Sequence, residues 1–236
     1  DYPKSEHLSK HLCTIDEVRS VVSWDFFSAN NFVDKNAKEW AKIVHDLMRE
    51  HSPSNNRLAI DVSDPVGIQT LLKQFNVEII NAQKFIETAR SIKCADELIC
   101  MQASLETAEK GMYLMKEKLQ AGMTEEELWS FMHKVNIENG GEWFETRLLV
   151  SGSRTNPWLQ ECSNKVIEPG ELVAFDTDMV GPYGYCADIS RTFVEGNRFN
   201  DEQKRLYSLS LEHIQHNEKL INCLLYTSDA ADEVVS

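Results

Sequence analysis

The segment between Leu172 and Phe193 constrains the fold of this chain more than any other part of it. It begins with an apolar run, Leu172–Phe175, and passes through the turn-forming run Gly181–Gly184 into a second extended stretch, Tyr185–Phe193. Glycine and proline favour tight turns, and extended runs on both sides of such a turn are typical of paired strands. We therefore expect an antiparallel β-hairpin.

Three aspartates lie where this hairpin would bring them together. Asp176 and Asp178 are two residues apart and would point to one face of a strand, while pairing centred on Tyr183 would set Asp188 opposite Asp178. Ionised carboxylates at one place repel and raise one another's pKa unless a cation compensates them. Divalent cations suit such hard oxygen ligands, so the pattern predicts a site for one metal ion, or for two bridged by carboxylates.

The alternative for these aspartates is a solvated turn, because aspartate is common in turns. The flanking residues argue against it. Leu172–Phe175 is apolar, so the strand that Asp176 and Asp178 would continue is predicted to be buried, and buried carboxylates need partners.

The first ninety or so residues predict a small α/β unit. Apolar residues recur at helical spacing between Ala37 and Met48, and this helix is expected to end by residue 53. Strands are expected at 58–62 and 77–80, with a helix between them that begins with Asp64 as N-cap and Pro65 in its first turn. Alternating strands and helices favour βαβ units and a mostly parallel sheet.

A different order follows residue 90. An amphipathic helix is expected over 95–119. Its apolar stripe comprises Leu98, Met101, Leu105, Ala108, Met112 and Met115. A capping box at 124–127 predicts a second helix that runs to about Val135, and extended runs follow at 143–150, 172–176 and 185–193. Helices followed by strands are typical of α+β domains, so the expected fold class is α/β plus α+β.

Composition narrows the partners that this chain is expected to have. The chain has 24 basic and 38 acidic residues, a formal net charge of −14, and a pI near 4.9. Such a charge repels phosphate backbones, so we expect no nucleic-acid partner. No apolar run approaches the roughly 20 residues of a membrane helix. Six cysteines without a C-x-x-C pair, in a chain with no secretory signal, favour reduced thiols and a cytoplasmic location.

The two ends of the chain lead to further expectations. The sequence starts at Asp1 without an initiator methionine or a signal-peptide core, and its residues from Cys223 onward are similar to a translated sequencing adapter. We expect an N-terminal domain at 1–90, part of a second domain at 91–222, and a non-native tail at 223–236. The second domain is thus expected to be cut short.

The hairpin resembles the metal-binding hairpin of the creatinase/aminopeptidase, or pita-bread, family, which includes prolidase and Xaa-Pro aminopeptidase. Its Asp-Ile-Ser-Arg-Thr-Phe ending at 188–193 is a close match, and Arg90–Leu98 resembles the start of the family's catalytic domain. The resemblance implies a creatinase-type N-terminal α/β domain followed by a partial pita-bread catalytic domain. It also implies a homodimer and two divalent metal ions, with further ligands and a general base beyond residue 222. Iron or another first-row metal suits such a centre.

Two departures from the family pattern resemble one branch of it. Family peptidases usually carry Asp-x-Gly at the first metal ligand, where this chain has Asp176-Thr177-Asp178. They often carry Asn-Pro-His upstream, where this chain has Trp158 after Asn-Pro. Both features resemble the dimethylsulfoniopropionate (DMSP) lyase branch. That resemblance implies that all three aspartates, with Asp188, serve the metals, and that a small molecule, DMSP, is cleaved to dimethyl sulfide and acrylate by β-elimination.

Three aromatic residues are candidates for the substrate site. Trp158, Tyr183 and Tyr185 lie close in sequence to the predicted metal strands, and aromatic faces attract a sulfonium cation. Ordinary packing is the alternative for each of them.

Two other functions stay open at this point. One is an Xaa-Pro aminopeptidase, a prolidase or a creatinase-like metallohydrolase, and the other is an inactive binding or dimerisation module of the same family. Because the remaining ligands are expected beyond residue 222, this chain alone is predicted to bind metal poorly and to be inactive.

Overall fold

The computed structural model describes residues 13–220, and the chain divides into two compact units, one ending at Lys93 and the other starting at Cys94. This division falls close to the boundary expected at residue 90. The non-native tail expected at 223–236 lies outside the described residues. Among the described helices, none is long and apolar enough to cross a membrane.

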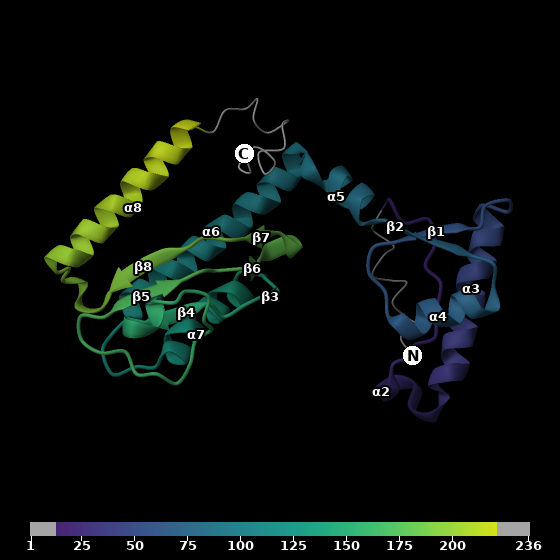
Figure 1. Ribbon diagram of the computed structural model, residues 1–236, viewed down its shortest axis with the longest axis horizontal. Coiled ribbons are helices and arrows are strands. Elements are labelled where there is room, and N and C mark those ends of the chain that lie inside the picture. The colour runs from purple at the N-terminus through teal and green to yellow at the C-terminus, as the bar shows by residue number, and fades with distance from the viewer. Residues whose placement is uncertain (1–12, 221–236) are drawn as a thin grey trace, which may run out of the picture. The chain divides into compact units, whose positions relative to one another are not determined.

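The first unit combines helices with a two-stranded sheet (Figure 1). Its elements are α2 (Phe26–Ala29), a 3-10 turn (Asn30–Phe32), α3 (Val33–His51), β1 (Arg57–Ile60), α4 (Pro65–Gln74), β2 (Glu78–Asn81) and α5 (Gln83–Ser91). Strands β1 and β2 pair in parallel, from Arg57 opposite Glu78 to Ile60 opposite Asn81. This pairing confirms the predicted βαβ unit.

Local sequence signals explain the start of α4 and the small core that it covers. Asp64 accepts a hydrogen bond from the backbone N–H of Val66 (2.8 Å), and Pro65 occupies the first turn, as predicted. Helices α3 and α4 pack together, and the fully buried Ala41 and Leu71 lie in the core between them and the sheet.

The second unit packs helices against two three-stranded sheets (Figure 1). Its elements are α6 (Ala95–Lys118), α7 (Glu125–Glu138), β3 (Trp143–Phe144), β4 (Leu149–Ser151), a 3-10 turn (Gly152–Thr155), β5 (Leu172–Phe175), β6 (Met179–Val180), a 3-10 turn (Pro182–Gly184), β7 (Cys186–Ala187), β8 (Arg191–Val194), a 3-10 turn (Glu195–Asn197) and α8 (Asp201–Leu220). The sheet orders are β3-β6-β7 and β4-β5-β8, and every neighbouring pair is antiparallel. Helices followed by strands are the order that the sequence predicts.

Helix α7 begins at the predicted capping box. The Thr124 hydroxyl accepts a hydrogen bond from the backbone N–H of Glu127 (3.1 Å), and the Glu127 carboxylate accepts one from the backbone N–H of Thr124 (2.7 Å). The two bonds satisfy N–H groups that a helix start leaves free, which stabilises the helix at this point. The helix ends at Glu138 rather than near Val135.

The buried face of α6 differs from the predicted apolar stripe. Its buried residues are Ser104, Thr107, Ala108, Gly111, Met112 and Met115. Leu98 and Leu105 of the predicted stripe are instead exposed. Small residues decide this face because they allow close approach: a Cβ on Gly111 would lie 2.3 Å from the sulfur of Met132 in α7.

The hairpin has the predicted register. Met179 lies opposite Ala187 in the β6–β7 pair, and Phe175 lies opposite Arg191 in the β5–β8 pair. Both pairs are centred on Tyr183. The two sheets therefore share one long hairpin whose register does not shift along its length.

The prediction of continuous strands over 143–150 and 185–193, and of a strand that includes Asp176, is wrong. Each run is interrupted where it passes from one sheet to the other. The interrupted segments are 145–147, 176–178 and 188–190. Asp178 has a backbone φ of 36°, which lies in the left-handed region and does not fit a pleated strand. The interruption thus falls at the level of the predicted metal ligands.

Candidate metal centre

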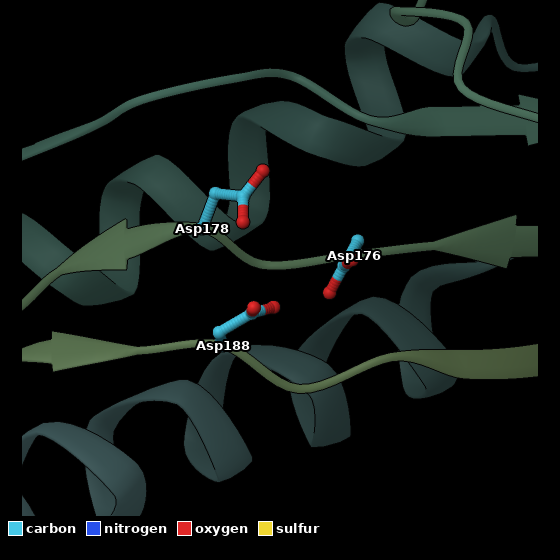
Figure 2. A group of neighbouring side chains, drawn as sticks. All are labelled: Asp176, Asp178 and Asp188. Atoms are coloured by element: carbon cyan, nitrogen blue, oxygen red, sulfur yellow. The ribbon is translucent and has the colours of Figure 1, made fainter. Parts of the chain in front are cut away.

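The interruption in the hairpin brings the three predicted aspartates together. Ligand oxygens of Asp176, Asp178 and Asp188 all lie within 4.8 Å of one another. Figure 2 shows their carboxylates converging from two neighbouring chain segments that lie between strands. The convergence that the sequence predicts is present, and it lies where both segments leave the strand ladder.

The backbone of Asp178 turns its carboxylate toward the cluster. Its φ of 36° is a conformation that glycine adopts easily and that aspartate and asparagine adopt more readily than other residues. The Thr146 hydroxyl donates a hydrogen bond to Asp178 Oδ2 (2.5 Å), and the backbone N–H of Glu145 donates to the Asp178 carbonyl (3.0 Å). The 145–147 interruption thus holds Asp178 by both its side chain and its backbone.

Thr177 lies between the two aspartates of its segment and is fully buried. Its hydroxyl donates to the carbonyl of Ala187 (2.8 Å) and accepts from the backbone N–H of Ile189 (2.8 Å). These two groups flank Asp188 in the chain. Thr177 and Thr146 were not identified from the sequence; for Thr177, a usable signal was its position between two ligand candidates.

The neighbouring carboxylates perturb the pKa of Asp188. The pKa of Asp188 is raised from 3.8 to about 6, first by a hydrogen bond with Asp176, then by partial burial and by the negative charges of Asp176, Asp178 and Glu145. In the part of the chain that the structure describes, no Lys, Arg or His forms an ion pair with any of the three aspartates. A clustered set of hard oxygen donors whose repulsion is uncompensated fits divalent metal ions.

The raised pKa of Asp188 predicts how the metal-free protein responds to pH. The folded state binds this proton more tightly than the unfolded state, so folding stability falls as pH rises from about 4 through about 6. We expect Asp188→Asn to lack this loss, so that its melting temperature exceeds that of the wild type above pH 7 but not at pH 4. Thermal unfolding of chelator-treated protein across this range measures the difference.

The control for this prediction is Asp201→Asn. The side chain of Asp201 is fully exposed at the start of α8, and its partner Lys204 lies 3.4 Å away, an exposed pair that contributes little to stability. We expect no pH-dependent difference for that variant. A melting temperature of Asp188→Asn that tracks the wild type at every pH would contradict the proposed repulsion.

Comparison with known proteins places the chain in a family. Residues 99–227, more than half of the chain, match the family model described as "Metallopeptidase family M24". The chain belongs to metallopeptidase family M24. Members of M24, the pita-bread metallopeptidases, typically hold a dinuclear metal centre, and the hairpin with the three aspartates lies inside the matched residues.

The relatives of this M24 chain include two proteins named dimethylsulfoniopropionate lyase DddP. The one from Roseobacter denitrificans is 36% identical over 228 residues, which are 94% of this chain and 51% of the relative. The one from Roseovarius nubinhibens is 38% identical over 202 residues, which are 84% and 45%. The chain thus spans about half the length of the curated relatives it matches.

Solved structures support the fold of this M24 chain. The Xaa-Pro dipeptidase from Bacillus anthracis superposes with a TM-score of 0.66 at 19% identity, over 88% of this chain and 63% of that one. At this identity the likeness shows the fold alone, a mixed α/β architecture shared with M24 peptidases. It covers only part of that enzyme.

The three predicted substrate residues lie at different places in the second unit. Trp158 is 37% exposed, in a loop that returns to the sheet where Glu161 pairs with Leu148. The carbonyl of Leu148 also accepts from the backbone N–H of Asp176 (2.9 Å), so this loop is anchored at the level of the aspartates.

The two predicted tyrosines lie elsewhere on the hairpin. Tyr183 is exposed at its tip, and the Tyr185 hydroxyl donates to Glu97 of α6 (3.2 Å). No hydrogen bond or ring contact of the described residues joins either tyrosine to the aspartates. A substrate role for all three aromatic residues stays a prediction.

A separate cavity of about 420 Å³ lies among α6, β8 and α8. Its lining includes Lys116, Arg191, Phe193, Phe199 and Tyr207, and none of the three aspartates. This cavity contains no carboxylate among its lining residues, so the aspartate cluster remains the candidate metal site.

Proposed function

We propose that the protein is a metal-dependent lyase that cleaves DMSP to dimethyl sulfide and acrylate. The observation that carries this proposal is Asp178, a third carboxylate in the cluster where family peptidases usually have glycine. The identity of 36–38% to two DMSP lyases, over most of this chain, supports it. A small-molecule substrate, and a homodimer as the assembly, belong to the same proposal.

The aspartates are the groups that would hold the metal ions. We propose that Asp176, Asp178 and Asp188 provide part of the ligand set for two divalent ions, iron or another first-row metal. Bound there, the metal centre supplies a Lewis acid that makes the hydrogen next to the substrate carboxylate more acidic. Further ligands and the general base are proposed to come from residues after 222.

The remaining chemistry concerns the substrate's charge and its leaving group. A carboxylate base takes the proton from the carbon next to the substrate carboxylate, the electrons of that C–H bond form the new C=C bond, and the C–S bond breaks to release neutral dimethyl sulfide. We propose that Trp158, in the loop that returns to the sheet at Glu161, lies against the sulfonium cation. A good cation–π contact contributes about 0.5–2 kcal/mol.

The second candidate function is hydrolysis of an Xaa-Pro bond. Membership of a metallopeptidase family favours it. A peptidase needs polar groups around the scissile amide, and Trp158 stands where family peptidases often have a histidine. An inactive binding or dimerisation module would be favoured only by the loss of the ligands expected beyond residue 222.

Assay of the protein expressed from its complete gene tests the proposal. Incubated with DMSP, the metal-loaded protein is expected to release dimethyl sulfide, detected in the gas phase, with acrylate in equal amount. Chelation is expected to abolish release, and re-addition of a first-row divalent ion to restore it. Hydrolysis of an Xaa-Pro dipeptide with no dimethyl sulfide would instead establish the second candidate, and the absence of both activities would favour the third.

A further inference from the structure

We propose that Thr177 is a positioning residue that fixes Asp188 against the other two aspartates and thereby sets the metal affinity of the centre. The inference rests on the proposed metal role of the three aspartates. Thr177 touches none of the reacting groups in this scheme. Its effect would pass through the backbone that carries Asp188.

The geometry around Thr177 is that of a hydrogen-bonded link across a gap. Residues 176–178 and 188–190 face each other between the two sheets and belong to neither. There the Thr177 hydroxyl binds the carbonyl of Ala187 and the N–H of Ile189, both at 2.8 Å. It supplies hydrogen bonds in a stretch where the strand ladder is interrupted.

These two hydrogen bonds restrain the backbone of Asp188. The two backbone groups that Thr177 binds lie immediately before and after Asp188, so both peptide units that flank its Cα are held. Thr177 itself lies between Asp176 and Asp178 in the chain. One buried hydroxyl therefore connects the segment that carries two ligands with the backbone on both sides of the third.

Burial makes this link costly to lose. Thr177 is 0% exposed, so water cannot readily replace its hydroxyl, and the polar groups of Ala187 and Ile189 would lose this partner. A carboxylate cluster needs its spacing held against mutual repulsion to bind a cation well. Residues that orient metal ligands from behind typically change metal affinity by about 10- to 100-fold when they are replaced.

The test is a titration of the full-length metal-free protein with Mn²⁺, followed by electron paramagnetic resonance of the free ion. Thr177→Val keeps the shape and removes the hydroxyl, and we expect it to weaken the apparent Mn²⁺ affinity by about 10- to 100-fold. Thr177→Ser keeps the hydroxyl and is expected to bind within about threefold of the wild type. Should the valine variant not fold, Thr177→Ala takes its place.

The matched control is Thr107→Val in α6. Thr107 is also buried, 2% exposed, and its hydroxyl donates to the carbonyl of Ala103 in its own helix (2.9 Å). Both valine variants are expected to lower the melting temperature, but Thr107→Val is expected to leave Mn²⁺ affinity unchanged. A purely stabilising role for Thr177 would give the two variants the same Mn²⁺ affinity.

Two results would overturn the inference in distinguishable ways. If Thr177→Val binds Mn²⁺ as the wild type does while Asp188→Asn does not, the aspartates hold metal and Thr177 does not position them. If Asp188→Asn also binds like the wild type, the metal role of the cluster fails, and the inference fails with it.

Discussion

Replacing Asp178 with glycine is expected to remove most of the metal affinity and the proposed lyase activity while leaving the fold intact. The backbone of Asp178 has a φ of 36°, which glycine adopts without steric cost. The substitution restores the Asp-x-Gly pattern usual in family peptidases, so the chain loses a ligand without strain. We expect metal affinity to fall by at least the roughly 10- to 100-fold that is typical when a residue that orients a metal ligand is replaced.

Asp178→Ala is the matched variant for this experiment. It removes the same carboxylate but keeps a Cβ in the left-handed region, which costs about 1–2 kcal/mol. Wild-type Asp178 carries a Cβ at the same φ, so we expect both variants to lose metal affinity equally and the glycine variant to be the more stable of the two. Metal content of the purified variants, their melting temperatures after chelation and their release of dimethyl sulfide measure the three effects.

The outcome separates two roles of Asp178. Full metal content and lyase activity in Asp178→Gly would contradict a ligand role and would leave Asp176 and Asp188 as the hairpin ligands, as in the family peptidases. Equal destabilisation of the glycine and alanine variants would contradict the backbone argument instead.

Replacing Glu125 with alanine is expected to destabilise the second unit by about 3–5 kcal/mol. Glu125 is fully buried in the first turn of α7. It accepts hydrogen bonds from the backbone N–H and hydroxyl of Ser151 (2.7 and 2.9 Å) and of Ser163 (3.1 and 2.9 Å), and it forms an ion pair with Arg154. Its loss leaves several donors, including a guanidinium, without their acceptor.

The position of Glu125 explains why so many segments depend on it. These bonds connect the start of α7 with Ser151 in β4, with Arg154 in the 3-10 turn after β4, and with Ser163, which follows the loop that carries Trp158. Lys165 and Glu171 add a second ion pair at 2.6 Å, and Lys165 also donates to the Ser151 hydroxyl. In this partly buried network, the negative charges of Glu125 and Glu171 are therefore compensated by the positive charges of Arg154 and Lys165.

Glu126→Ala is the control for this prediction, because Glu126 lies in the same helical turn and is exposed. We expect it to change stability by no more than about 0.5 kcal/mol. Urea denaturation followed by tryptophan fluorescence gives the midpoints, with the slope checked for a change in cooperativity. Equal midpoints for the two variants would show that the buried carboxylate is dispensable.

Much of the fold follows from local sequence signals. The N-cap Asp64 and the capping box from Thr124 to Glu127 start their helices as predicted, because these bonds are made within a few residues. The register of the hairpin is also as predicted, since turn residues and strand lengths fix it locally. The buried face of α6 was predicted only in part: Ala108, Met112 and Met115 are buried as predicted, whereas Gly111 is buried by the close approach of α7.

The sequence by itself determined which residues form the cluster. Asp176, Asp178 and Asp188 were identifiable from their spacing around Tyr183. Because the register does not shift, residues equally far from Tyr183 in the sequence lie opposite each other in the hairpin. The sequence also predicted the βαβ order of the first unit and the order of two helices before strands in the second.

Only the tertiary structure decided how the carboxylates converge and what holds them. The interruption of the hairpin, the left-handed backbone of Asp178 and the bonds from Thr146 and Thr177 depend on contacts between segments far apart in the chain. The periodicity of apolar residues indicates on which face of a regular helix or strand a residue lies. It cannot report an interruption whose hydrogen bonds are completed by another segment, and the three aspartates of this M24 chain converge at such an interruption.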